Sequence, residues 1–377
     1  MNNIELITKY STKAWDKIYK AESRSSLLDA PDANVQWTGA KTVKIAKFQA
    51  GGLKNYYRNN NGDNRVPQVP GSGTSFAHQG VGFGYQMSNV GLTWEEFTVK
   101  MDRGASYPIE LFDNEETDGL TLGAATTEIS RVVMIPEVDA YCFSTLASYC
   151  SEASATGVKL ADGSTVNGLG NLVKVAADKT NALATLNDAL LYFDEHEVPA
   201  EDQIIFVSAK YFNYLRNDNT ELARYLMQAD YNKNVKFTLT EYEGRQIVVV
   251  PPQRFRTAFT TITDSGDGYA FGYWDATAGE AVVSEEINFI ICAKSAVMHV
   301  VKYNKVKILS GDVVLAGGGF DGYMLFARVY HDVFVQDNKR YAIYTCLNNG
   351  TDKKVITAAT STVPAKKVKT AENTLVE

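Results

Sequence analysis

Histidine is the side chain of this sequence best suited to acid–base chemistry near neutral pH. The four histidines lie far apart in the sequence, at His78, His196, His299 and His331. His331 directly precedes Asp332, and a His–Asp pair could act as a general base. Both residues fall in a β-prone segment, however, so we expect a hydrogen-bonded structural pair instead of a catalytic one.

Adjacent carboxylates occur twice, at Glu115-Glu116 and at Glu285-Glu286. Two carboxylates could bind a metal ion or share acid–base work. Neighbouring side chains on a strand or loop point apart, however, so solvated or paired surface positions are favoured for both pairs.

Other chemical motifs are weak in this sequence. It contains no G-x-x-x-x-G-K-[ST], H-E-x-x-H or G-x-S-x-G pattern. The run Gly80–Gly84 does not lie between a strand and a helix, which disfavours a phosphate-binding loop. The segment Lys54–Arg58, KNYYR, could stack on bases, but a protein–protein contact is at least as well supported. We therefore expect no catalytic, cofactor or metal site.

The cysteines also point away from redox or metal chemistry. None of the four belongs to a C-x-x-C pair, and three of them lie within apolar segments. We expect all four to be reduced and to pack as small apolar side chains: Cys142, Cys150, Cys292 and Cys346.

Composition narrows the class of protein. The 377 residues include 37 Lys+Arg and 44 Asp+Glu, a net charge of −7, and 45% are hydrophobic. Such a chain forms one large or two to three medium domains. The acidic balance argues against a protein that wraps nucleic acid, because neutralising phosphates requires an excess of Lys and Arg. No apolar run approaches the ~18 residues that span a membrane, and the N-terminus has no secretory signal.

Charge is distributed unevenly along the chain. Residues 1–66 contain 11 basic and six acidic side chains, a net charge of +5, whereas residues 110–202 contain four basic and 17 acidic side chains, or −13. We expect these oppositely charged segments to meet, within one subunit or between copies. The candidate contact residues in the basic part are Lys41, Lys44, Lys47, Lys54, Tyr56, Tyr57 and Arg58.

The N-terminal third predicts an arm followed by a long hairpin. Residues 4–29 have apolar side chains at irregular helical spacing, and Pro31 ends the element. Residues 35–48 and 92–101 are β-prone and flank about 40 residues that are rich in Gly and Asn. A segment of that length without a core pattern is either disordered or functional, so we expect a protruding hairpin whose residues 50–90 serve assembly.

The rest of the chain predicts mixed α/β structure followed by long strands. An apolar stripe indicates a long helix over residues 121–150, with Pro136 kinking or restarting it. A second helix follows a Thr180 cap and ends before Pro199, and Ser208 caps a third after the buried strand 204–207. Long strands are expected at 297–309 and 323–335. Asp337–Lys339 is expected to form a turn.

Six sequence blocks, taken in order, resemble one family. They are SRSSLLDAP (23–31), VQWTGAKTVKIAKF (35–48), LTWEEFTVKMDRGASYPIELFDNEET (92–117), VVMIPEVDAYCFSTLA (132–147), AKSAVMHVVKYNKVKIL (293–309) and ARVYHDVFVQDNKRYAIY (327–344). The series resembles the major capsid proteins of tailed bacteriophages with the HK97-like fold, over residues 1 to about 348. The segment 50–90 is longer and richer in Gly and Asn than is usual for that family.

The resemblance implies an α+β capsid fold with a defined division of the chain. The implied parts are an N-terminal arm (1–34), an extended β-hairpin or E-loop with flanking strands (35–108), a P-domain with the spine helix (109–151), an A-domain (152–296), P-domain strands (297–337), an A-domain return (338–349) and a C-terminal tail (350–377). The arm begins at Met1, which predicts a separate scaffolding protein or a chain processed upstream.

The function implied is structural. The resemblance predicts self-assembly through pentamers and hexamers into an icosahedral shell around double-stranded DNA, without sequence-specific binding, cofactor or membrane. Implied partners are a separate scaffolding protein and a portal, with a cement protein as a further candidate. The implied locations are the virion capsid and, during assembly, the host cytoplasm. Lys54 lies in polar surroundings that disfavour a covalent cross-link. The first alternative is an encapsulin-like cargo compartment of the same fold. The second and less favoured alternative is a mixed α/β enzyme.

Overall fold

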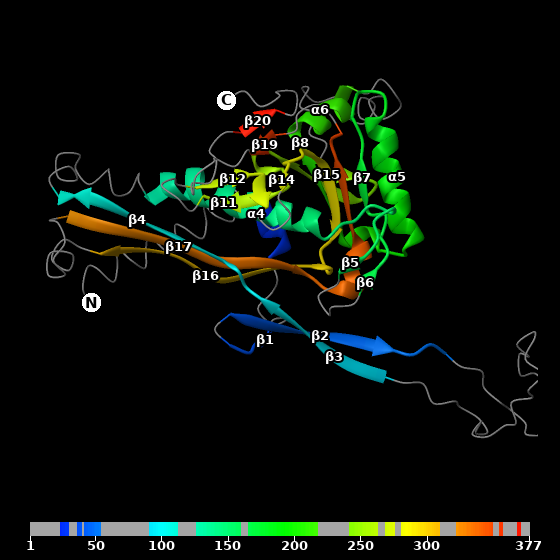
Figure 1. Cartoon of the computed structure of the whole chain (residues 1–377), viewed down its shortest axis with the longest axis horizontal. Helices are drawn as coiled ribbons and strands as arrows, with labels where there is room; N and C mark the ends of the chain where they lie inside the picture. The colour runs from blue at the N-terminus through cyan, green and yellow to red at the C-terminus, as the bar shows by residue number, and fades with distance from the viewer. Residues whose placement is uncertain are drawn as a thin grey trace, which may run out of the picture. The chain divides into compact units, whose positions relative to one another are not determined.

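The computed structural model describes a chain of mixed helices and strands (Figure 1). The described residues are 23–29, 36–39, 41–53, 90–111, 126–159, 165–217, 241–262, 268–275, 280–309, 322–349, 354–356 and 368–370. The chain divides into two compact units, Gln36–Phe97 and the remainder. The α+β class expected from the sequence is confirmed. Within the described ranges, no helix is long and apolar enough to cross a membrane.

The smaller unit is a three-stranded sheet. Its strands are β1 (Gln36–Trp37), β2 (Thr42–Ala50) and β3 (Val90–Thr98), in the order β1-β2-β3. The two hairpin strands expected at 35–48 and 92–101 are therefore present, although the second ends earlier than predicted. Val43 and Ile45 are buried on alternate positions of β2, as its β-branched sequence predicts. Most of the predicted assembly segment 50–90 lies outside the described residues.

The larger unit contains a second three-stranded sheet built from long antiparallel strands. They are β4 (Met101–Glu110), β16 (Val297–Leu309) and β17 (Gly322–Val335), in the order β16-β17-β4. β17 pairs with β4 from His331 opposite Met101 to Gly322 opposite Glu110. The two long strands predicted near the C-terminus are confirmed, and β17 joins them to a segment from the N-terminal third.

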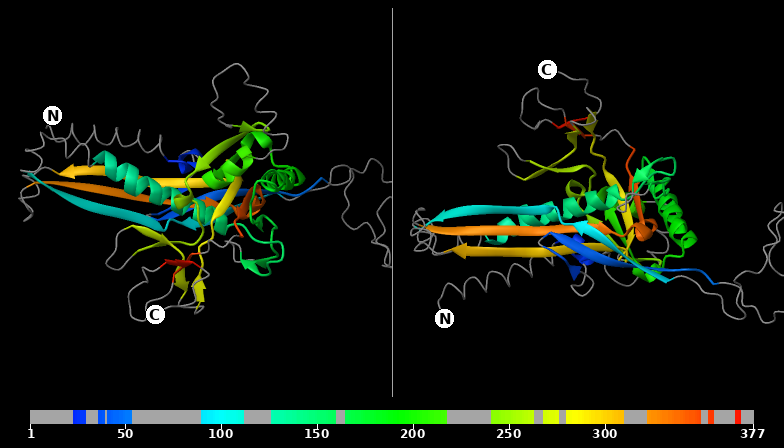
Figure 2. Two further views of the ribbon diagram at one scale, coloured as in Figure 1. Left: turned by 90° about the horizontal axis from the view of Figure 1, so that it is seen from above. Right: turned by 60° about the horizontal axis from the view of Figure 1, so that its bottom comes forward.

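One long helical element lies along this sheet (Figure 2). It starts as the π-helix η3 (Ile129–Met134) and continues as α4 (Ile135–Ser148). Pro136, the second residue of α4, follows the π-helical stretch directly, so the change from π-helix to α-helix coincides with the kink or restart expected at this proline, although the helical element continues through it. Ile135 and Val138 pack against Val329 of β17 and fix the helix on the sheet.

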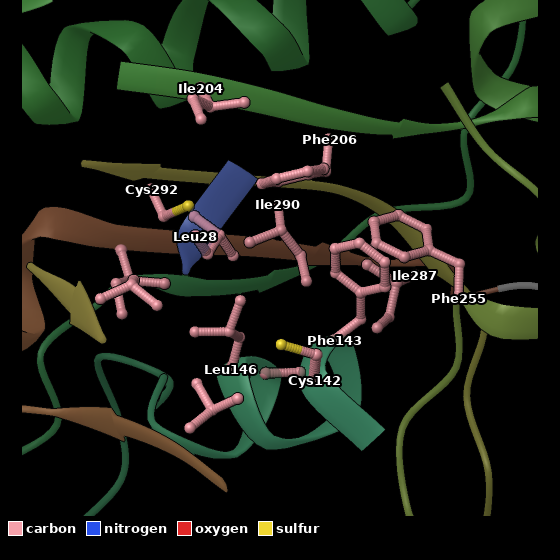
Figure 3. Packing of buried hydrophobic residues seen from close by; sticks show 14 of the residues in the cluster. Leu28, Cys142, Phe143, Leu146, Ile204, Phe206, Phe255, Ile287, Ile290 and Cys292 are labelled. Carbon is pink, nitrogen blue, oxygen red and sulfur yellow. The ribbon is translucent and has the colours of Figure 1, made fainter. Parts of the chain in front are cut away.

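A six-stranded mixed sheet forms the rest of the core. Its order is β7 (Leu172–Lys174), β18 (Ile343–Leu347), β15 (Ile287–Ala293), β8 (Gln203–Ser208), β10 (Arg245–Val250) and β9 (Glu241–Tyr242). Every residue of β8 is buried, and alternate residues enter two different cores. Ile204 and Phe206 belong to the core cluster that contains Phe143 and Leu146 of α4 (Figure 3), while Ile205 and Val207 pack with α5 (Ala182–Glu195) and α6 (Ala209–Asn217).

The helix caps were predicted with mixed success. The Ser208 Oγ accepts a hydrogen bond from the backbone N–H of Tyr211 at 3.1 Å, which confirms the cap of α6. The predicted Thr180 cap of α5 is wrong. The carboxylate of Asp178 instead accepts the backbone N–H of Thr180 at 2.8 Å and that of Asn181 at 3.0 Å. These amides belong to the turn before α5 and not to its first turn, so Asp178 stabilises that turn and does not cap the helix.

The remaining described elements are short. They are η1 (Ser25–Leu28), β5 (Val158–Lys159), β6 (Thr165–Val166), η4 (Ala200–Asp202), η5 (Pro252–Arg254), β11 (Phe259–Thr261), β12 (Tyr269–Phe271), β13 (Tyr273–Asp275), β14 (Glu280–Val282), η6 (Asp337–Ala342), β19 (Lys354–Ile356) and β20 (Val368–Thr370). The turn predicted at Asp337–Lys339 is the first part of η6.

Candidate interaction surfaces and the anchored N-terminal segment

Two of the predicted contact lysines already have partners within the hairpin. Lys44 of β2 forms an ion pair with Glu96 of β3, and Lys47 forms one with Glu95 at 3.1 Å. The two pairs lie on opposite faces of the hairpin, because 44 and 47 differ in parity, as do 95 and 96. The third lysine, Lys41, is exposed. Their predicted role between subunits stays a prediction.

The other predicted contact residues lie outside the described residues. This applies to Lys54, Tyr56, Tyr57 and Arg58, and equally to His78, to Gly80–Gly84 and to Glu115-Glu116. The hairpin-tip contact therefore remains an expectation from the sequence.

An exposed apolar row on β3 was missed by the sequence analysis. Val90, Leu92 and Trp94 alternate along one face of the strand and are 62%, 57% and 45% exposed. Phe97 and Val99, which follow in the same run, are buried. The signal is present in the sequence, because the apolar positions change from even to odd numbers after Trp94, which moves them to the other face of the strand.

The face of the sheet β16-β17-β4 that bears Arg328 is basic and aromatic. Arg328 donates two hydrogen bonds to Asp102, at 2.8 and 2.6 Å, and its guanidinium lies 5.7 Å from the ring centroid of Tyr303. The ammonium of Lys305 lies 5.5 Å from the same ring. Phe326 is 38% exposed two residues before Arg328 on β17. Aromatic and Arg side chains exposed together are enriched at protein–protein contacts.

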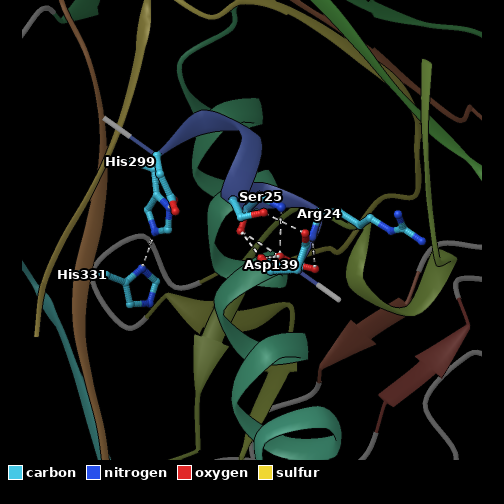
Figure 4. A network of polar contacts seen from close by, with 8 residues as sticks. Arg24, Ser25, Asp139, His299 and His331 are labelled. Atoms are coloured by element: carbon cyan, nitrogen blue, oxygen red, sulfur yellow. Dashed lines mark hydrogen bonds and ion pairs between the residues drawn. The ribbon is translucent and has the colours of Figure 1, made fainter. Parts of the chain in front are cut away.

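The segment Ser23–Asp29 is anchored to α4 through Asp139, which is fully buried (Figure 4). Its carboxylate accepts hydrogen bonds from the hydroxyls of Ser23 and Ser25 at 2.8 and 2.7 Å. It also accepts the backbone N–H groups of Arg24 and Ser25, both at 3.1 Å. These donors stabilise a buried charge that would otherwise be very costly.

Two further contacts complete this anchor. Arg254 forms an ion pair with Asp139 at 3.2 Å, which supplies the opposite charge. Leu28 is buried and belongs to the core cluster between α4 and the six-stranded sheet. The basic arm segment 23–29 therefore enters the larger unit as an integral part of its core.

The expected pairing of His331 with Asp332 is wrong. His331 Nδ1 lies 3.1 Å from His299 Nε2, and His299 Nδ1 lies 2.6 Å from a carboxylate oxygen of Asp29. The sequence could not show this, because pairing of β16 with β17 is what brings residues 299 and 331 together.

Asp332 has its own partners. Its carboxylate accepts the hydroxyl of Tyr141 at 2.7 Å and the backbone N–H groups of Lys100 and Val333 at 2.9 and 2.8 Å. Burial raises the pKa of Asp332, and these hydrogen bonds oppose that rise. The residue is thus a structural link between β17, α4 and the start of β4.

One cavity of about 570 Å³ lies between α4 and the long sheet and is lined by His331, Arg103 and Glu137 among apolar side chains. Arg103 donates to Glu137 at 2.5 Å and to the carbonyl of Gly268 at 2.9 Å, so the two charges neutralise each other. Burial and the neighbouring His299 hold the pKa of His331 well below its usual range. A general base needs a pKa near the working pH, so this arrangement does not favour acid–base catalysis.

The remaining chemical candidates are structural. Glu285 pairs with Lys174 at 3.3 Å and Glu286 pairs with Arg256, so the two carboxylates serve different partners. The cysteines are all free and buried, as expected. Across the described ranges, no three His, Cys, Asp or Glu side chains are grouped for a metal ion.

Comparisons with known proteins gave matches among solved structures. No family model and no curated protein matches the sequence. A chain of Microbacterium phage Oxtober96 is 14% identical, with 87% of this chain and 91% of that chain covered and a TM-score of 0.48. A structure of the mature capsid of bacteriophage PhiM1 is 13% identical, with 82% of this chain and 83% of that chain covered and a TM-score of 0.47. A virus-like particle from Pyrococcus furiosus is 11% identical, with 90% of this chain and 99% of that chain covered and a TM-score of 0.44.

Proposed function

We propose that this chain is the major subunit of a phage capsid, which assembles through pentamers and hexamers into an icosahedral shell around double-stranded DNA. The observation that carries the proposal is the order of the elements. The hairpin strands β2 and β3, the strand β4 and the helix η3–α4 precede the six-stranded sheet, and β16 and β17 return to form a sheet with β4, in which β17 pairs with β4. β18 then rejoins the six-stranded sheet.

This order supports the parts that the sequence resemblance implies. The blocks 92–117, 132–147, 293–309 and 327–344 fall on β3–β4, on η3–α4, on β16 and on β17–β18. These are the elements that build and join the two larger sheets, so the resemblance concerns the framework and not the loops. We assign β2–β3 to the E-loop, η3–α4 with β4, β16 and β17 to the P-domain, and the six-stranded sheet to the A-domain.

The exposed surfaces suit a subunit that makes several contacts. The apolar row Val90, Leu92 and Trp94 and the basic, aromatic face around Arg328 lie on different sheets. A shell subunit that spreads its binding over several interfaces of ~1,200–2,000 Å² can assemble reversibly at each of them. The net charge of −7 suits a shell around DNA, since an inner surface that bound DNA tightly would oppose its packaging and release.

The partners follow from this role. We infer a separate scaffolding protein and a portal, with a cement protein as a further candidate partner, assembly in the host cytoplasm and a final location in the virion. The DNA is enclosed without sequence-specific contacts, and no membrane is involved.

The test is electron microscopy of the purified chain, alone and with the products of neighbouring genes. Closed shells of uniform size support the proposal, and nuclease-resistant double-stranded DNA within particles from infected cells separates a phage capsid from a cargo compartment. Shells that enclose a protein and no DNA favour the encapsulin-like alternative. A chain that stays monomeric under all of these conditions contradicts the proposal.

A further inference from the structure

Asp29, His299 and His331 form a continuous chain of polar contacts between the N-terminal segment and the long sheet, with Asp29 at its solvent-exposed end and both histidines inside (Figure 4). The His299 and His331 side chains are almost fully buried, and their ring centroids lie 5.3 Å apart with the rings nearly perpendicular. The backbones of Asp29 and His299 are also bridged. The position of the segment Ser23–Asp29 is thus tied directly to a pair of titratable rings.

Only a few arrangements of hydrogen atoms give each contact between Asp29, His299 and His331 one donor and one acceptor. With both rings neutral, His299 Nδ1–H donates to the Asp29 carboxylate, and His331 Nδ1–H donates to His299 Nε2. One added proton can be accommodated, because a single charged ring still leaves an acceptor on the other ring. Two added protons cannot, because both nitrogens at the 3.1 Å contact then carry hydrogens and both rings are positive.

The surroundings provide little compensation for a second charge. From η1, Asp29 faces His299; from α4, the ring of Tyr141 lies edge-on to His331, with a centroid distance of 5.4 Å. Asp332 on β17 directs its carboxylate to Tyr141 and to backbone N–H groups instead of to His331. Across the cavity, β4 supplies Arg103 and α4 supplies Glu137, which are bound to each other. Asp139 on α4 is already bound to Arg254 and the arm segment.

We propose that the His299–His331 pair is a proton-controlled latch for the N-terminal segment: it holds Ser23–Asp29 in place while it carries at most one proton, and a second proton releases the segment. Release uncovers the rings, which then gain water and can each accept a proton. The proposal concerns the isolated subunit and does not depend on shell assembly.

The direction of the effect follows from the protonation of His331. Burial first, and His299 second, hold the pKa of His331 well below the ordinary value of 6.5 when the segment is docked. A freed ring returns toward 6.5, so the released state binds more protons below that pH. Docking is therefore fully stable above about pH 6.5 and is lost as the pH falls toward the pKa of the docked state.

Hydrogen exchange of the full chain measures this directly. The amides of Arg24 and Ser25 bind Asp139 only in the docked state, so their protection, divided by the intrinsic exchange rate at each pH, reports docking. A latch that takes up one proton predicts a loss of protection of about tenfold per pH unit below about pH 6.5. Amides of β8 serve as the internal reference. Protection of Arg24 and Ser25 that stays constant down to about pH 5 overturns the proposal.

Variants separate the latch from general acid denaturation. In His331→Asn, the amide nitrogen replaces Nδ1 as donor to His299 but cannot titrate, so docking should persist and lose its acid response. Asp29→Asn should lower protection at every pH. His196→Asn is the matched control, because His196 is exposed on the surface near α5, and it should behave as the parent chain. An acid response that survives in His331→Asn, or that disappears in His196→Asn, contradicts the latch.

A second measurement covers the case in which His331→Asn does not fold. Ring nitrogen chemical shifts of His331 in the parent chain report its protonation directly. The latch requires His331 to gain its proton at the pH at which the released segment becomes the major state. A ring that stays neutral after the segment has been released overturns the proposal.

Discussion

Lys47 of β2 and Glu95 of β3 face each other across the hairpin, with the ammonium nitrogen 3.1 Å from a carboxylate oxygen. The Glu95 side chain is almost buried and the Lys47 side chain is 22% exposed. A pair in this position serves to hold the two strands in register and offers little free charge to a neighbour. If the basic excess of the N-terminal third acts between subunits, as the sequence predicts, Lys41 is the better candidate, because it is exposed immediately before β2.

We predict that Lys41→Glu slows assembly and that Lys47→Glu acts differently. Lys41→Glu should reduce the assembly rate most at low ionic strength, where screening is weak, and leave the melting temperature unchanged. Lys47→Glu places two carboxylates together and should destabilise the hairpin by about 1 kcal/mol. Light scattering at several salt concentrations, with thermal melts, measures both effects.

The charge swap Lys47→Glu with Glu95→Lys is the control, because it restores an ion pair in the same place. It should recover the stability lost in the single variant. If the swapped hairpin is stable but assembles poorly at low salt, then Lys47 itself contacts a neighbour, and the assignment to Lys41 is wrong.

We predict that the apolar row on β3 is required for assembly and not for folding. In the double variant Leu92→Thr with Trp94→Thr, exposed side chains are replaced by a β-branched one, so the free energy of unfolding should change by no more than about 0.5 kcal/mol. The assembly rate should fall at least about tenfold, since ~1.4 kcal/mol of lost contact suffices for that factor. Leu191→Thr, at an exposed position of α5, is the matched control. Normal shells from the double variant would show that this row is not an interface.

We predict that Asp139→Asn releases the N-terminal segment. The amide can accept fewer hydrogen bonds than the carboxylate, leaves Arg254 without its counter-charge and places N–H donors against the backbone amides of Arg24 and Ser25. Loss of one partner from a buried charged network costs about 3 kcal/mol. Urea unfolding should show this loss, and amide exchange should show Arg24 and Ser25 unprotected. A variant with parental exchange at both amides would refute the role of Asp139.

We predict that the four buried thiols make the protein less stable at alkaline pH. Burial raises the pKa of Cys150 to about 12 and of Cys346 to about 11, above the ordinary value of 9.0. The unfolded chain thus releases protons above about pH 9 that the folded chain retains, so the free energy of unfolding falls as the pH rises through this range. Urea titrations at increasing pH measure the slope.

Two controls belong to the thiol prediction. Cys346→Ala removes one titrating group and should make the slope smaller after allowance for the buried tyrosines. A thiol reagent at neutral pH should modify none of the four cysteines in the folded chain and all of them in urea. Rapid modification of the folded chain would contradict their burial.

Sequence patterns identified the elements whose period is clear. The long strands 297–309 and 323–335, the buried strand 204–207 and the Ser208 cap all follow from local residue types. The pairing of His299 with His331 and the turn that Asp178 stabilises before α5 did not, since each depends on which of several polar neighbours forms the contact in three dimensions. Asp139 could not be recognised either, because a single carboxylate on a helix becomes a buried acceptor only when Ser23–Asp29 packs above it.

The exposed apolar row on β3 was missed in the sequence for a different reason. Leu92, Trp94, Phe97 and Val99 together look like one amphipathic strand, and only the change of parity after Trp94 separates the exposed pair from the buried pair. The alternation of apolar and polar residues therefore predicted the strand correctly, but it did not predict which face of the strand would be exposed to solvent.

The pairing of β4 with β17 has a consequence for how the protein is made. Met101 is opposite His331 and Glu110 is opposite Gly322, so more than 200 residues separate the partners. At ~5–20 residues per second, a ribosome needs about 10–40 s after β4 emerges to deliver β17. Throughout that interval β4 presents an unpaired strand edge, which invites pairing with other nascent chains on the same message. The yield of correctly folded subunits should therefore depend on how soon β17 follows β4 from the ribosome.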